Sequence, residues 1–249
     1  MKVIAFDFDG VIIDSSNEQY IISVMAFNRM GNRLRDTKKL KKDFLFLRNF
    51  AKVTEDFYAM MVMLSEGKIP EDDKKILQRR DRIVTTQRSR AVEFVRLFFE
   101  SRKELMRKGF GYWLGLQEVN IKFIRMMKRL SAEHSLFIAT AKDKETVYRV
   151  LRYSGVMIPR KKILSREDAY SKSEKLKIIS GISGKDTKDM IFVEDNLENL
   201  KDTMGLGINP VLVEWGHSTP AQRREARKLG IPVLTKRNFE KQLLKITGE

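Results

Sequence analysis

Two carboxylates, Asp7 and Asp9, stand one residue apart near the start of the chain, and Gly10 follows them. The four residues 3–6 before them are all apolar, which is typical of a strand buried on both faces of a parallel sheet. Open α/β sheets bind their ligands at the carboxyl ends of the strands, where these acids would lie. One acid could be a nucleophile or a metal ligand, and the other an acid and base. On its own, however, such a pair could simply cap the end of a strand and have no catalytic role.

Two later apolar runs also end in polar residues that suit phosphate and metal. The run at 135–140 ends in Thr140, whose hydroxyl and nearby amides could bind phosphoryl oxygens. The run at 190–193 leads into Glu194 and Asp195. Between them, Lys172 stands just before an expected helix, where an ammonium group can neutralise a phosphate. These residues could supply the partners that the first two acids need.

The elements that must position these residues follow an alternating pattern of strands and helices. We expect strands at 3–6, 135–140, 162–165, 190–193, 210–213 and 231–234, and helices at 119–130, 144–153, 174–179 and 221–229. Such alternation predicts an α/β fold, a doubly wound, Rossmann-like parallel sheet.

The first strand has no expected partner until residue 135, because the intervening residues have helical spacing. Glycines and aromatic residues at 109–115 break this helical pattern and are expected to form a linker with some rigid content. The sequence therefore predicts a catalytic core at 1–15 and 116–249, with an inserted all-helical domain at 16–115.

Composition limits the chemistry and the location of the protein. The 249 residues include no cysteine and only two histidines, which excludes thiolate metal sites and disfavours a histidine-rich zinc site. The longest strictly apolar run, 59–64, is too short to cross a bilayer, and the N-terminal residues enter a strand at once. We therefore expect no membrane partner, no signal peptide and a cytoplasmic location, whereas the oligomeric state stays open.

The net charge of +16 raises the question of an anionic partner. Residues 16–115 hold 22 Lys and Arg against 13 Asp and Glu, and the rest of the chain holds 27 against 20. The helical domain is therefore the more basic part per residue. A basic protein can bind nucleic acid, but no recognised nucleic-acid motif is present. Nucleic acid is an unlikely partner that the charge does not exclude.

Taken together and in order, the polar strand ends resemble the haloacid dehalogenase (HAD) superfamily of phosphoryl-transfer enzymes. The first motif of that family matches Asp7-Phe8-Asp9-Gly10-Val11, and the second matches residues 137–140, which end in Thr140. Its motif lysine is matched by Lys172, with Lys175 as a competitor, and its acidic pair by Glu194-Asp195. Asn199 occupies the place where many members carry a further acid. The insertion point after Ser15 resembles that of members with a helical C1-type cap.

The resemblance implies a role for each matched residue. Asp7 would attack phosphorus and form an aspartyl-phosphate, while Asp9 would protonate the leaving alcohol and then deprotonate water. Mg²⁺ would bind Asp7, the backbone carbonyl of Asp9, Glu194 and Asp195. The groups that hold the transferring phosphate would be Asp9, Gly10, Thr140, Ala141 and Lys172.

The function implied by this resemblance is a Mg²⁺-dependent phosphatase that hydrolyses a small phosphorylated metabolite, a phosphate monoester. Dehalogenase members lack the second Asp and transport ATPases have Thr in its place, so Asp9 favours a phosphatase or a phosphomutase. A phosphomutase that uses the same site is the main alternative. A nucleic-acid-binding protein or end-phosphatase that uses the basic cap is a weaker one. His217 is expected to be a surface or packed histidine.

Overall fold

The computed structural model describes residues 1–248, and contacts within the chain divide it into two compact units. One unit combines Met1–Asp14 with the chain from Val119 onward, and the other is Ser15–Glu118. The domain bounds expected from the sequence are 1–15 with 116–249, and 16–115. They differ slightly from this division by contacts and remain a prediction. Among the described residues, no helix is both long enough and apolar enough to span a membrane.

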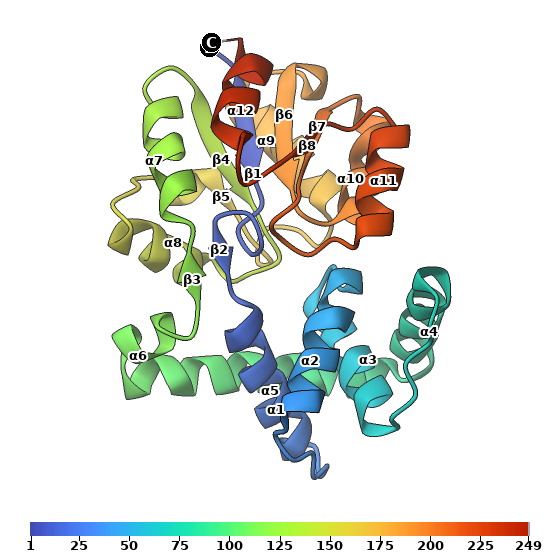
Figure 1. Cartoon of the computed structure of the whole chain (residues 1–249). Coiled ribbons are helices and arrows are strands. Elements are labelled where there is room, and N and C mark those ends of the chain that lie inside the picture. Colours follow the sequence, from blue (N-terminus) through green and yellow to red (C-terminus); the bar gives the residue numbers. More distant parts are fainter. Residues whose placement is uncertain (249) are drawn as a thin grey trace. The chain divides into compact units, whose positions relative to one another are not determined.

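The first unit is built on a six-stranded sheet in which every neighbouring pair is parallel. The strand order is β5-β4-β1-β6-β7-β8, so the first strand of the chain lies in the interior of the sheet (Figure 1). The strands are β1 (Val3–Phe6), β4 (Ser135–Ala139), β5 (Ile163–Leu164), β6 (Met190–Glu194), β7 (Asn209–Val213) and β8 (Val233–Leu234). The predicted fold class, a parallel α/β sheet with a helical insertion after its first strand, is confirmed.

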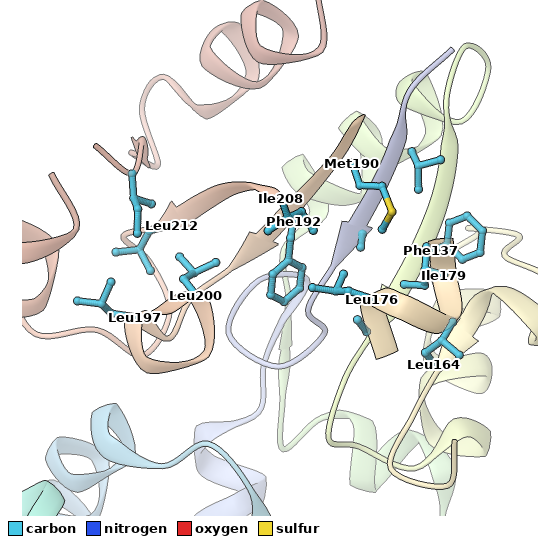
Figure 2. Close-up of a cluster of buried hydrophobic side chains, with 14 of the residues drawn as sticks. Phe137, Leu164, Leu176, Ile179, Met190, Phe192, Leu197, Leu200, Ile208 and Leu212 are labelled. Carbon is cyan, nitrogen blue, oxygen red and sulfur yellow. The ribbon is translucent and has the colours of Figure 1, made fainter. Parts of the chain in front are cut away.

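Side chains that alternate along the strands build hydrophobic layers on both faces of this sheet. Val3 and Ala5 of β1 belong to a buried cluster that also holds apolar residues from three helices, and Figure 2 shows part of this cluster. Phe6 points to the other face, where its ring contacts Phe123 at 5.4 Å between centroids. Phe123 in turn stacks on Phe239. The continuous apolar run of β1 is thus explained by burial on both sides.

The helices of the sheet unit partly differ from the sequence expectation. They are α7 (Ile121–Leu130), α8 (Lys144–Tyr153), α9 (Lys172–Ser183), α10 (Leu197–Thr203), α11 (Pro220–Lys228) and α12 (Phe239–Thr247). The helix expected at 174–179 is longer than predicted, because α9 begins at Lys172 and continues through Gly181 to Ser183, and Gly184, whose φ of 65° is left-handed, ends it. Helices α10 and α12 were not predicted, and each is shorter than ten residues.

The second unit is all-helical up to residue 114, as its apolar spacing predicts. Its helices are α1 (Ser16–Arg29), α2 (Lys38–Leu47), α3 (Thr54–Ser65), α4 (Asp73–Thr86), α5 (Arg88–Lys108) and α6 (Phe110–Leu114), with the 3₁₀ turn η1 (Arg48–Phe50). Helix α2 begins inside a basic stretch because the Thr37 side chain accepts a hydrogen bond from Leu40 N. The expected linker at 109–115 contains α6. Two-residue strands, β2 (Ile13–Asp14) and β3 (Glu118–Val119), pair with each other.

A fully buried ion pair joins the first and the longest helix of this unit. Arg102 of α5 donates to Glu18 of α1 through Nε at 2.6 Å and Nη2 at 3.1 Å. Trp113 of α6 donates its indole Nε1–H to the same carboxylate at 3.0 Å. Since all three side chains are buried, this network connects segments far apart in sequence.

Candidate functional site

Three adjacent strands bring the predicted site residues to one edge of the sheet. Strand β1 lies between β4 and β6, with Phe6 opposite Ile138 on one side and Val193 on the other. The chain leaves these strands through Asp7, Thr140 and Asp195. All three side chains are buried. The parallel register therefore gathers residues that are more than 180 positions apart in the sequence.

The segment after β1 folds into a tight turn that requires glycine. Asp7 N donates to Val193 O at 2.8 Å, and the amides of Ile12 and Ile13 both donate back to Phe8 O. Gly10 closes the turn with a φ of 83°, and its amide donates to Ile13 O at 2.7 Å. A Cβ atom at this position would lie 1.7 Å from Asp195 Oδ2. Both the backbone conformation and the close approach therefore exclude a side chain at residue 10.

Asp7, Glu194 and Asp195 form a buried acidic cluster at this edge. One ligand atom from each lies within 4.8 Å of the others. Lys172 Nζ lies 2.7 Å from Asp7 Oδ1 and 2.9 Å from Glu194 Oε2. The same ammonium donates a hydrogen bond to Ala139 O at 2.7 Å. The cluster thus holds more negative charge than its one contacting lysine neutralises.

Electrostatics at the cluster show the same excess of negative charge. Burial, together with the neighbouring Asp7 carboxylate, raises the pKa of Glu194 well above its usual value, and Lys172 offsets this only in part. Burial by itself would lower the pKa of Lys172, but Asp7 and Glu194 outweigh it and raise that pKa. Lys172 is therefore held as a cation between two buried carboxylates.

The structure separates the two candidate lysines that the sequence left open. Lys172 contacts the carboxylates, whereas Lys175 Nζ, one turn further along α9, donates to the carbonyl oxygens of Ala169 at 2.6 Å and Tyr170 at 3.1 Å. Burial, followed by the nearby Lys172 charge, lowers the pKa of Lys175 to about 8. Lys175 thus braces the segment before α9, and Lys172 is the lysine at the acidic cluster.

Asp195 is held by a loop whose role the sequence did not indicate. His217 contacts Asp195 Oδ2 twice, through its backbone N at 2.7 Å and its ring Nδ1 at 2.6 Å. The prediction of a packed histidine is correct, because His217 is buried, but the residue also fixes a carboxylate of the cluster. A Cβ atom on the preceding Gly216 would lie 2.4 Å from the Asp195 side chain, so this loop also needs glycine.

Asp9 pairs with a lysine that the sequence analysis did not consider. Lys142 Nζ donates to Asp9 Oδ1 at 2.9 Å, and the lysine side chain is fully buried. The backbone N of Lys142 donates to Thr140 Oγ1 at 3.1 Å, so this pair also involves the predicted phosphate-binding threonine. Ala141 lies between them and is half-buried. Lys142 follows the expected strand end by two residues, but its pairing with Asp9 joins two loops that lie far apart in the sequence, and no sequence pattern indicates it.

The two asparagines after the acidic pair serve the local backbone. Asn196 is the N-cap of α10, and its side chain accepts hydrogen bonds from the amides of Glu198 at 2.9 Å and Asn199 at 3.3 Å. Asn196 thereby supports the loop that carries the acidic pair. Asn199 is buried in the first turn of the same helix.

Comparison with known proteins relates the chain to solved structures. No protein-family model matches it, and no curated protein has a matching sequence. A haloacid dehalogenase-like family hydrolase from Streptococcus pneumoniae is 15% identical, with a TM-score of 0.67 over 99% of this chain and 98% of that one. A predicted phosphatase from Clostridium acetobutylicum is 13% identical, with a TM-score of 0.66 over 98% of both chains. A predicted phosphoglycolate phosphatase from Haemophilus somnus is 15% identical, with a TM-score of 0.64 over 99% of this chain and 98% of that one.

These likenesses extend over almost the whole chain at low sequence identity, so they establish its architecture. They cover both the parallel sheet and the helical insertion after β1. The resemblance indicated by the four motifs is thereby confirmed for the fold. The chain has the fold of the haloacid dehalogenase-like hydrolases.

Proposed function

We propose that this protein is a metal-dependent phosphatase that hydrolyses a small organic phosphate monoester through an aspartyl-phosphate on Asp7. The observation that carries the proposal is the position of Lys172, whose ammonium lies between the buried carboxylates of Asp7 and Glu194. This arrangement stands at the carboxyl ends of β1 and β6 on a haloacid dehalogenase-like fold, and two structurally similar proteins are described as predicted phosphatases.

A divalent cation fits the donors of the acidic cluster. Three buried carboxylates converge there, and Lys172 compensates the charge of Asp7 and Glu194 only in part. Buried carboxylates are costly unless cations compensate them, and a hard cation such as Mg²⁺ prefers oxygen ligands. We infer that Asp7, Glu194, Asp195 and the backbone carbonyl of Asp9 hold Mg²⁺. When bound, the ion would lessen the repulsion between the anionic nucleophile and the anionic phosphate.

The chemistry assigned to the residues proceeds in two displacements. A carboxylate oxygen of Asp7 forms a bond to phosphorus while the bond to the ester oxygen breaks, and Asp9 gives its proton to the departing alcohol. Asp9 then takes a proton from the water that attacks the aspartyl-phosphate, which frees Asp7 and releases inorganic phosphate. Lys172 and Thr140, with the loop residues Gly10 and Ala141, hold the charged oxygens that transfer.

The experiment is a comparison of hydrolysis by the wild-type chain and Asp7→Asn across a panel of phosphate monoesters in the presence of Mg²⁺. The panel includes p-nitrophenyl phosphate, glycerol phosphate and 2-phosphoglycolate, the last because one structurally similar protein is described as a phosphoglycolate phosphatase. We expect the substitution, and separately chelation of the metal, to abolish phosphate release while the circular dichroism spectrum stays unchanged. Hydrolysis that persisted after either treatment would refute the proposal.

The cytoplasmic location remains a prediction. The phosphomutase alternative, which requires the same site, also remains a prediction. Product analysis with a sugar phosphate separates the two reactions, because a phosphatase releases inorganic phosphate and a mutase returns an isomeric sugar phosphate. The nucleic-acid alternative rests on the basic helical unit. It predicts binding that weakens steeply with salt.

A further inference from the structure

Lys142 occupies a place that a structural role alone does not explain. Its side chain is fully buried in the loop between β4 and α8, and its ammonium is 5.8 Å from the centre of the Phe8 ring. Removing an ammonium group from water is costly unless an anion compensates it. The compensating anion is the Asp9 carboxylate, whose Oδ1 lies 2.9 Å away. A buried lysine is thus paired with the acid to which the proposed function gives the proton transfers.

The backbone of Lys142 is fixed on both sides. Its amide donates to Thr140 Oγ1 at 3.1 Å, and its carbonyl accepts from Arg166 N at 3.3 Å. The loops that follow β1 and β4 come from neighbouring strands, so the Lys142–Asp9 contact ties one loop to the other (Figure 1). Lys142 is therefore held rigidly enough to determine where the Asp9 carboxyl group lies.

We propose that Lys142 is a positioning residue that holds Asp9 for proton transfer, and that it thereby extends hydrolysis to phosphate esters of poorly acidic alcohols. This inference rests on the proposed function. An alkoxide leaves phosphorus poorly unless a proton reaches its oxygen as the bond breaks, whereas a nitrophenolate leaves readily without one. In the resting chain Asp9 is the carboxylate that faces Lys142, and it takes up a proton from the bound phosphate ester, a monoanion. In the first displacement that proton passes to the ester oxygen as the bond to phosphorus breaks, which leaves Asp9 again as the carboxylate that faces Lys142. In the second displacement Asp9 takes a proton from the attacking water and passes it to the released phosphate.

The test compares variants at residue 142 on two esters in the presence of Mg²⁺. The esters are p-nitrophenyl phosphate and the alkyl phosphate that the wild-type chain hydrolyses fastest. For Lys142→Met we expect kcat to fall by about 100-fold on the alkyl ester and by less than tenfold on the aryl ester, with KM changed less than twofold. Lys142→Gln keeps a donor and should recover part of the alkyl-ester rate. Lys144→Met is the matched control, since Lys144 pairs with Asp168 at the half-exposed start of α8 and should leave both rates unchanged.

A double-mutant cycle with Asp9→Asn, followed with enzyme in excess over the alkyl ester, separates positioning from other roles. If Lys142 acts through Asp9, Lys142→Met causes no further loss once Asp9→Asn is present. Additive losses would overturn the proposal. An equal rise in KM for both esters with weaker inhibition by inorganic phosphate would also overturn it, because Lys142 would then bind the substrate phosphate.

Two further results distinguish a failure of the Lys142 proposal from misfolding of a variant and from failure of the proposed function. If Lys142→Met fails to fold, Lys142→Gln decides: equal losses on both esters in a folded Lys142→Gln chain would contradict positioning. Failure of the proposed function shows elsewhere, as phosphate release that persists in Asp7→Asn. An effect of Lys142 that is confined to alkyl esters requires Asp9 as the proton donor.

Discussion

At the scale of single residues, the account depends on Lys172 between two buried carboxylates. Replacing Lys172 with Met would leave Asp7 and Glu194 without their contacting cation and would remove the charge that faces the transferring phosphate. We expect kcat/KM for p-nitrophenyl phosphate to fall by about 10²–10³-fold, the range seen when one electrostatic contact to a transition state is lost. Lys177→Met, at an exposed position on the same helix, is the control and should keep full activity.

The buried Lys175 gives a prediction about pH. Its pKa of about 8 in the folded chain lies below its ordinary value of 10.5, because burial disfavours the ammonium form. The unfolded chain therefore binds the proton more tightly, so stability rises with pH between these two values. From pH 7.5 to 9.5 the free energy of unfolding of the wild-type chain should rise by about 2 kcal/mol relative to Lys175→Met. Urea unfolding at both pH values measures this, and parallel pH profiles would contradict it.

Several site residues could be predicted from sequence because their backbone positions are set by strand ends. Apolar runs in the sequence end at Asp7, at Thr140 and at the pair Glu194-Asp195. The parallel pairing of β1 with β4 and β6 then brings these residues together. Lys142 and the role of His217 could not be predicted. Their importance comes from side-chain contacts with Asp9 and Asp195 across loops, which no local pattern encodes.

At the scale of elements, α9 carries Lys172 into the site through a well-defined start. The Ser171 hydroxyl and the Glu174 carboxylate form a capping box that places Lys172 in the first turn. The sequence predicted this helix at 174–179 with Lys172 just before it, so both observed ends lie outside the predicted bounds. Gly181 only weakens the helix, and α9 runs past it because Leu176 and Ile179 pack into the sheet core.

Gly181 therefore offers a stabilising substitution. It lies inside α9 with an ordinary helical backbone, is exposed, and a Cβ atom there would meet nothing within 4 Å. Gly181→Ala should raise the free energy of unfolding by about 1 kcal/mol, since alanine loses less backbone entropy than glycine in a helix. Urea unfolding measures the change, and phosphatase activity should stay the same. A loss of stability would show that the helix does not continue through this residue.

For the whole molecule, the helical insertion was predictable because the first strand has no expected partner before residue 135. In the structure β1 does pair with β4, which begins at Ser135. The packing within the insertion was not. Trp113, expected in a linker, is buried with its indole on Glu18, a contact that joins residues 95 apart in the sequence. Such contacts depend on how helices meet in space, and helical periodicity along the chain does not specify that.

The buried Arg102–Glu18 pair predicts where the helical unit is most sensitive. Arg102→Met leaves a carboxylate buried without its cation, so the chain should lose about 3–5 kcal/mol of stability in urea unfolding. The double variant Glu18→Leu with Arg102→Met should recover part of that loss. As a control on the same helix, Glu104→Gln removes the exposed pair with Arg29 and should cost less than about 1 kcal/mol. Equal costs for the buried and the exposed pair would contradict the prediction.

Transfer of the phosphoryl group to Asp7 can be detected by mass spectrometry. The wild-type chain is mixed with Mg²⁺ and its best phosphate ester, quenched in acid within milliseconds to seconds, and digested at acidic pH. We expect one phosphoryl group on the peptide that contains Asp7 in the wild-type chain, and none on the same peptide of Asp7→Asn. Phosphate release by the wild-type chain with no phosphorylated peptide at any quench time, or a phosphoryl group on another residue, would contradict it.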